Sequence, residues 1–383
     1  MDAPAPRALR FDRNEFSGAF GDLGTDFPLI VGMVAAAGLD GASVLIAYGL
    51  MEIGTGLYYR LPIPVQPLKA VAVIVITQHI GGAVLRGAGL AIGIAMLLLS
   101  ALGLLDWLAR VVPKAVIRGI QLGLGLQLAS IALRDYVGAD ESAGWWLAGL
   151  AFIIIVALLG NRRLPAGVPV IALGLIYALA FKIDLPRLVA ATGIHLPQLS
   201  APSISDVAQG FVLLALPQIP LSLGNSILAT RQIVHDYFPD VDLSVRKIGF
   251  TYALMNLINP FIGGVPTCHG SGGVAGHYAF GGRTGGSVVI YGTVFLVLGL
   301  FFGGAFTEIV KVFPLPVLGV LLLFEGLYLI VLIGDVAPVV TELRLAALVG
   351  ACAAFLPYGY VIGLVVGTAL FYLGRRGLTG FAR

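Results

Sequence analysis

The stretch "GGVPTCHGSGGVAG", residues 263–276, interrupts a chain that otherwise reads as one apolar segment after another. Six of its fourteen residues are glycine, and it also contains a proline, a cysteine and a histidine. Non-helical backbone at membrane depth is tolerated only where it is buried in protein or lines a cavity. The stretch is therefore the first candidate for a binding site.

The composition restricts the class of protein. Of the 383 residues, 58% are hydrophobic and only 11% are charged, and the mean hydropathy is +0.97. Apolar runs of about 18 residues or more recur, as in proteins with many transmembrane helices. A large soluble helical protein would need amphipathic faces rich in charge, and these are missing. We therefore predict an all-α polytopic membrane protein that lies in a lipid bilayer.

Apolar runs and the breaks between them predict fourteen segments. They lie near residues 16–37, 41–59, 65–79, 83–105, 113–133, 145–160, 166–182, 206–230, 246–263, 267–279, 286–306, 312–333, 338–356 and 358–374. Two of them, 65–79 and 267–279, are too short to cross a hydrocarbon core of about 30 Å. The last pair could instead form one re-entrant hairpin.

The charges between segments indicate an orientation. Basic residues gather on one predicted side, in "RALRFDR" (7–13), "NRR" (161–163), the stretch 231–247 and "RR" (375–376), whereas Arg86, Lys182 and Arg187 fall on the other. The positive-inside rule then places both termini in the cytoplasm, and we expect the protein in the cell (inner) membrane. We expect no cleaved signal peptide, because the N-terminus lacks an apolar core, and no soluble regulatory domain.

The two halves of the chain also resemble one another. "VVPKAVIRGIQLGLGLQL" (111–128) resembles "VFPLPVLGVLLLFEGLYL" (312–329) at an offset of about 201 residues, and "PIPVQPLKAVAV" (62–73) falls opposite "GVPTCHGSGGVAG" (264–276) at 202. Seven segments per half is an odd number, so the second half must insert upside down relative to the first. We predict two inverted repeats, 1–200 and 201–383, an arrangement typical of secondary transporters.

In such repeats, a pair of short segments broken by Gly or Pro at matching positions indicates the binding site. Pro62, Pro64, Pro67 and Pro266 make the approach to each short helix extended. Each helix then begins with free N–H groups and a partial positive charge. Two such ends facing one another form an anion site without any arginine.

Polar side chains at these breaks fit an oxyanion. Gln66, Thr267, His269 and Ser271 are hydrogen-bond donors. Lys69 is an ionisable residue inside an apolar segment and hence a functional candidate, or alternatively part of a structural ion pair with Asp22 or Asp26.

Two further helices carry polar groups at similar depth. Asp22 and Asp26 stand at i and i+4, on one helix face, and Gln218 and Asn225 occupy the apparent repeat mate of that helix. Glu325 is a candidate for proton coupling or for an interhelical hydrogen bond.

Other chemistries find little support. The single "CHG" lacks a second Cys/His cluster, so we expect no metal. There is no nucleophile elbow of a hydrolase, and the glycine patterns fit helix packing better than nucleotide loops. We expect no enzyme activity, no cofactor and no nucleic-acid partner.

The sequence also resembles a known family. "FGDLGTDFPLI", "LPIPVQPLKAVA", "LPQIPLSLGNS", "MNLINPFIGGVPTCHGSGGVAGHYAFGGRTG" and "FPLPVLGVLLLFEGLYL" are similar to the molybdate transporter branch of the sulfate permease superfamily, in the expected order over residues 16 to 333. The resemblance implies core segments within 16–105 and 206–306 and gate segments within 113–182 and 312–374. Ser271 and His277 depart from it, since many members have alanine and glutamine there, which puts fine selectivity in question.

The resemblance further implies a secondary active transporter of molybdate, with tungstate, that works by elevator-type alternating access. The implied site consists of Asp22, Gln66, Pro67, Lys69, Gln218, Asn225, Thr267, Cys268, His269, Gly270 and Ser271, with Asp26 and Glu325 as coupling candidates. Proton coupling and a homodimer are further hypotheses.

The alternatives are transport of sulfate or another anion on the same scaffold and, less favoured, an anion channel. A nucleobase–proton symporter is disfavoured because His269 and Gln218 stand where a glutamate would be expected.

Overall fold

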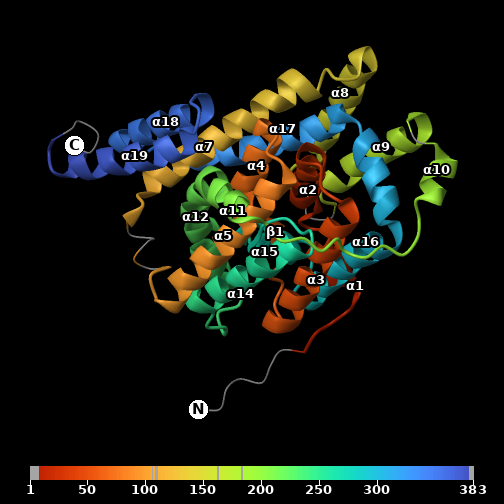
Figure 1. Cartoon of the computed structure of the whole chain (residues 1–383), viewed down its shortest axis with the longest axis horizontal. Coiled ribbons are helices and arrows are strands. Elements are labelled where there is room, and N and C mark those ends of the chain that lie inside the picture. Colours follow the sequence, from red (N-terminus) through yellow and green to blue (C-terminus); the bar gives the residue numbers. More distant parts are fainter. Residues whose placement is uncertain (1–7, 106, 108–110, 162–163, 183, 379–383) are drawn as a thin grey trace.

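The computed structural model describes residues 8–105, 107, 111–161, 164–182 and 184–378, which are mostly helical (Figure 1). The first half contains α1 (Arg13–Ala19), α2 (Leu23–Ala37), α3 (Gly41–Tyr59), α4 (Lys69–Gln78), α5 (Gly82–Ala101), α7 (Lys114–Ile131), α8 (Glu141–Leu158), α9 (Gly167–Phe181) and α10 (Leu185–Ala190). The second half contains α11 (Ile204–Gly210), α12 (Leu216–Leu221), α13 (Ala229–Tyr237), α14 (Val245–Ile258), α15 (Ser271–Ala279), α16 (Gly286–Val312), α17 (Leu315–Val331), α18 (Val340–Phe355) and α19 (Gly359–Arg375).

Several helices are suited to a bilayer. In the described part of the chain, five are long and apolar enough to cross one alone: Gly82–Ala101, Lys114–Tyr136, Ile204–Leu221, Gly286–Val312 and Leu315–Asp335. Helices α1 and α2 form a further candidate, bent by 40°. The protein is therefore a multi-pass membrane protein. Every predicted segment overlaps a helix, but α4 has only 10 residues and α15 only 9. The number of crossings thus stays a prediction.

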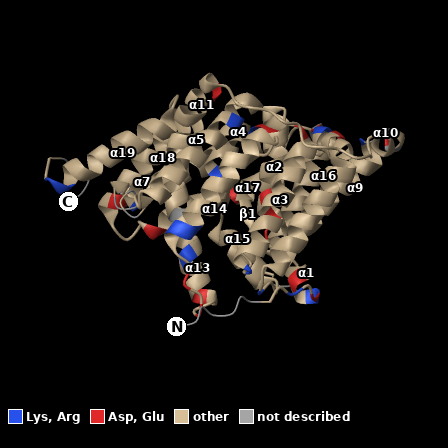
Figure 2. Ribbon diagram, turned by 60° about the horizontal axis from the view of Figure 1, so that its bottom comes forward, with Lys and Arg blue, Asp and Glu red and all other residues tan. Residues whose placement is uncertain are grey.

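The surface fits the same environment. Charged residues are sparse along the helices and gather near their ends, for example around α1, α10 and α13 (Figure 2). Large apolar side chains such as Trp146 and Phe181 are exposed. Exposed apolar side chains of this size are favourable against lipid and unfavourable against water.

The helices pack in two groups. In the first, α3 lies along α16, and α5 packs against α11 and α14. The backbones of α3 and α16 approach so closely that a Cβ atom on Gly49 would lie 2.6 Å from the Gly292 carbonyl oxygen, as is typical of small residues between membrane helices. In the second group, α7 packs against α17 and α18, and α18 against α19. The groups meet where α2 and α4 contact α17 and α7.

Two short strands, which the sequence analysis did not predict, occur within the helical fold. β1 (Val65–Pro67) and β2 (Thr267–His269) pair antiparallel, with Gln66 opposite Cys268. Each strand directly precedes a short helix, α4 or α15, near the centre of the molecule (Figure 1). The nearby prolines make this backbone extended, and pairing the strands satisfies N–H and C=O groups that would otherwise be buried without partners.

The predicted helix at 206–230 is irregular. Between α11 and α13 the backbone twice widens into π-helical turns, at residues 211–215 and 222–228. Pro217 and Pro220 lie between these turns and remove N–H donors from the ladder, which accounts for local widening. Asn225 lies in the second turn, and its side chain lies outside the described residues.

Candidate functional site

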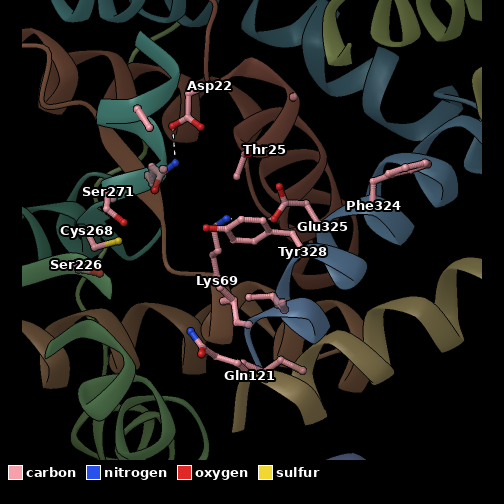
Figure 3. Close-up of a pocket in the computed structure, with 18 of the residues that line it drawn as sticks. Asp22, Thr25, Lys69, Gln121, Ser226, Cys268, Ser271, Phe324, Glu325 and Tyr328 are labelled. Carbon is pink, nitrogen blue, oxygen red and sulfur yellow. Dashed lines mark hydrogen bonds and ion pairs between the residues drawn. The ribbon is translucent and has the colours of Figure 1, made fainter. Parts of the chain in front are cut away.

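A cavity of about 650 Å³ lies where the two groups of helices meet. Its walls come mainly from α2, α4 and α15 on one side and from α7 and α17 on the other (Figure 3). Among the predicted site residues, it brings together Asp22, Gln66, Lys69, Gln218, Cys268, Gly270, Ser271 and Glu325. Pro67 is buried within β1 and is not among the lining residues.

The N-termini of the two short helices differ in one respect. At α4, Gln218 Oε1 accepts hydrogen bonds from the backbone N–H groups of Ala70 and Val71, at 3.1 and 3.3 Å. A glutamine from α12 therefore already caps this end. At α15 the N-cap is Gly270, which has no side chain to cap the helix, and Ser271 and Gly272 line the cavity. The first N–H groups of a helix have no intrahelical partners, so α15 offers the more accessible donors.

The alternation of strand β2 decides which of its side chains reach the cavity. Successive residues of a strand point to opposite faces, and Cys268 lines the cavity while Thr267 and His269 do not. Thr267 Oγ1 accepts a hydrogen bond from Asn259 at 3.0 Å. His269 Nε2 lies 2.8 Å from Thr251 Oγ1, and its ring is fully buried. Both side chains thus lie behind the strand.

Asp22 and Gln66 form one unit at the end of the cavity next to α15. Gln66 Nε2 donates to Asp22 Oδ2 at 2.5 Å (Figure 3). Glycines make room for this pair. A Cβ atom on Gly273 would lie 2.7 Å from Asp22 Oδ2, and one on Gly270 would lie 1.4 Å from Gln66 Oε1.

Asp22 lines the cavity, whereas Asp26 does not. Asp22 is the N-cap of α2, and its carbonyl oxygen accepts a helical hydrogen bond from the Asp26 N–H at 3.1 Å, so the two residues stand one turn apart as their i, i+4 spacing predicts. Asp26 is fully buried, and its Oδ2 accepts hydrogen bonds from the Tyr48 and Tyr291 hydroxyls, at 2.7 and 3.2 Å.

Lys69 pairs with Glu325, not with Asp22 or Asp26 as the ion-pair alternative had it. Lys69 Nζ lies 3.1 Å from Glu325 Oε2 and 4.9 Å from the centre of the Tyr328 ring. The pair joins the first residue of α4 to α17 across the cavity (Figure 3). Sequence reasoning missed the contact because its partners lie 256 residues apart.

Helix α7 contributes residues that the sequence analysis did not single out. Arg118 and Gln121 line the cavity, although an anion site without arginine was expected. Arg118 Nη1 donates to Gln121 Oε1 at 2.8 Å, and Nη2 pairs with Asp335. The available signal was the repeat at 111–128, which contains both residues and matches the segment that carries Glu325.

A family profile described as "Molybdate transporter of MFS superfamily" matches residues 14–128 and 210–329. The chain belongs to this molybdate transporter family. The matched ranges contain the cavity residues Asp22, Gln66, Lys69, Arg118, Gln121, Gln218, Cys268, Gly270, Ser271 and Glu325. The family and its relatives are transporters and not enzymes.

This member of the molybdate transporter family has a curated relative in "Molybdate transporter 2" of Arabidopsis thaliana. The two are 35% identical over 367 residues, which cover 82% of this chain and 78% of the relative. Two solved structures share the fold. They are the transmembrane domain of the cyanobacterial bicarbonate transporter BicA (TM-score 0.66, 18% identity, 91% of this chain and 99% of that one) and the murine anion transporter Solute Carrier 26 family member A9 in the inward-facing state (TM-score 0.73, 13% identity, 98% and 70%).

Proposed function

We propose that the protein is a secondary active transporter that imports molybdate, with tungstate as a second substrate, across the cell membrane. The observation that carries this proposal is the cavity where Lys69, Gln66 and the open N-terminus of α15 converge, in a chain of the molybdate transporter family. Helix N-termini bind oxyanions through backbone N–H groups and a partial positive charge.

The direct contacts that we propose are Lys69, Gln66, Ser271 and the first N–H groups of α15. Lys69 supplies a charge, and the others supply hydrogen bonds whose directions suit a tetrahedral oxyanion. Thr267 and His269 support the site from behind β2, and Gln218 holds the N-terminus of α4. Molybdate and sulfate are both tetrahedral dianions, so discrimination must come from size and hydrogen-bond reach, about 1–3 kcal/mol for each misfit contact.

We infer a fold of fourteen segments in two inverted repeats, 1–200 and 201–383, within the sulfate permease superfamily. The likeness to BicA and to Solute Carrier 26 member A9 supports this placement, although the family description names another superfamily. We propose that the two packing groups are the core (16–105 and 206–306) and the gate (113–182 and 312–374), and the helix contacts within each group support this division. In an elevator mechanism the core carries the anion past the gate.

We further propose that both termini are cytoplasmic and that the cavity opens to the cytoplasm. Lys114, Arg118 and Asp335 cluster at the ends of α7 and α17, on the side that the positive-inside rule assigns to the cytoplasm. The likeness to an inward-facing structure supports this state. Proton coupling also fits, because a proton bound with the dianion would reduce its repulsion from Asp22. A homodimer is a further hypothesis.

Uptake of radiolabelled molybdate into proteoliposomes tests the proposal, with empty liposomes as control. We expect saturable uptake that a pH gradient accelerates and that excess sulfate inhibits only weakly. Absence of both saturable uptake and binding would disprove the function. Stronger inhibition by sulfate would support a sulfate transporter, and currents that follow voltage without saturation would support a channel.

A further inference from the structure

The ion pair between Lys69 and Glu325 is open to the cavity. The side chains are 22% and 11% exposed, and both line the wall. A solute in the cavity can therefore reach both partners. Among the described lining residues, Lys69 and Arg118 carry the positive side chains, and Arg118 is already engaged by Asp335 and Gln121. Lys69 is thus the cation that an incoming anion can recruit.

The Glu325 carboxylate binds the Lys69 ammonium group in the same way as a bound oxyanion would. A carboxylate presents two oxygens that accept hydrogen bonds from an ammonium group, and so does a tetrahedral oxyanion. The ring of Tyr328 lies 4.9 Å from Lys69 Nζ and takes part of the remaining space around it. An oxyanion and Glu325 therefore cannot both bind Lys69 closely without repelling one another.

We propose that Glu325 is a tethered competitor of the transported anion for Lys69. In the empty transporter Glu325 holds Lys69, and with it the start of α4, against α17. When the anion binds Lys69 it displaces Glu325 and thereby releases α4 from α17. Glu325 in this way lowers the affinity for the anion and ties loading to the separation of the two groups of helices. The inference rests on the proposed function.

If Glu325 were only a structural brace for Lys69, neutralising it would have the opposite effect on the affinity for the anion. A brace that holds Lys69 in place for the anion would weaken anion binding when it is removed, whereas removal of a competitor strengthens binding. Glutamine has the length of glutamate and keeps an oxygen that can accept a hydrogen bond from Lys69, so Glu325→Gln is the substitution most suited to leave the protein intact for the comparison.

The test is equilibrium binding of molybdate to purified full-length protein by calorimetry, for wild type, Glu325→Gln, Lys69→Gln and the double variant. Glu325→Gln should lower the Kd by about tenfold. Lys69→Gln should raise it, and in that background Glu325→Gln should change the Kd by less than about twofold. Glu308→Gln is the matched control, because Glu308 pairs with Lys311 at 2.7 Å on the exposed end of α16 and should leave the Kd unchanged.

The outcomes separate the two proposals. Wild-type protein that binds no molybdate would overturn the proposed function itself. Wild-type binding with an unchanged or raised Kd for Glu325→Gln would overturn the competitor, and so would a lowered Kd that persists without Lys69. If Glu325→Gln does not purify as a folded protein, Glu325→Asp replaces it. The aspartate side chain is one methylene shorter, so its carboxylate lies further from Lys69. Glu325→Asp should therefore lower the Kd by a smaller factor than Glu325→Gln, and an unchanged Kd would again overturn the inference.

Discussion

Replacing Gly270, which precedes α15, by alanine should force the Gln66 side chain out of its position. A Cβ atom there would lie 1.4 Å from Gln66 Oε1 and 2.3 Å from Gln66 Cδ. The backbone itself, with φ −112° and ψ 131°, suits any residue. The conflict is therefore with one side chain. Gly270→Ala must displace the Gln66 amide and break its 2.5 Å hydrogen bond to Asp22.

The cost follows from the surroundings of Asp22. This side chain is 4% exposed, so it would lose its partner with little access to water. A buried polar group without its partner costs about 1–3 kcal/mol. Because Asp22 borders the cavity, a water molecule can replace part of the lost bond, and we expect about 1–2 kcal/mol of stability to be lost. The affinity for molybdate should fall by about tenfold, since Gln66 leaves the site.

Thermal unfolding and molybdate calorimetry on the purified variants measure both effects. Gly272→Ala is the matched control for stability, since a Cβ atom there meets nothing within 4 Å. Gln66→Ala should reproduce the losses of stability and affinity. The double variant Gly270→Ala/Gln66→Ala should lose little more, because both substitutions break the same hydrogen bond. Wild-type stability and affinity in Gly270→Ala, or losses that add in the double variant, would refute this reasoning.

Three further substitutions probe the site. Gln218→Leu uncaps the N–H groups of Ala70 and Val71 and should cost about 1–3 kcal/mol of stability, measured as a lower melting temperature; an unchanged melting temperature would show that the cap is dispensable. Lys69→Gln should raise the Kd for molybdate by about tenfold or more in calorimetry, and an unaltered Kd would remove Lys69 from the site. His269→Ala should lower the melting temperature but keep the Kd within about twofold, because the ring lies behind β2; a large loss of affinity in folded protein would place it in the cavity instead.

Local signals in the sequence located most of the helices. The predicted segments 41–59 and 166–182 nearly coincide with α3 (Gly41–Tyr59) and α9 (Gly167–Phe181), because apolar runs bounded by glycine, proline or charge define helices in a membrane. The prolines and glycines around 62–67 and 263–273 also indicated where extended backbone precedes a short helix.

Contacts between distant segments could not be predicted in this way. The periodicity of a three-residue strand does not say which face is occupied, so Thr267 and His269 were indistinguishable from Cys268 until the pairing with β1 was known. The same holds for the cap that Gln218 provides to α4 and for the partner of Lys69, both of which depend on how α12 and α17 pack against α4. The sequence likewise could not show that Asp22 borders the cavity while Asp26, one turn further along α2, is held by Tyr48 and Tyr291.

The pairing of β1 with β2 has a consequence for how the protein folds during its synthesis. Val65 must wait for His269, about 200 residues later in the chain, which at 5–20 residues per second takes about 10–40 s of synthesis. During that interval the nascent first half holds an extended segment whose backbone lacks its final partner. The binding cavity therefore cannot form until much of the second half has been made, and a truncated product that ends before residue 267 would insert helices without ever acquiring a site.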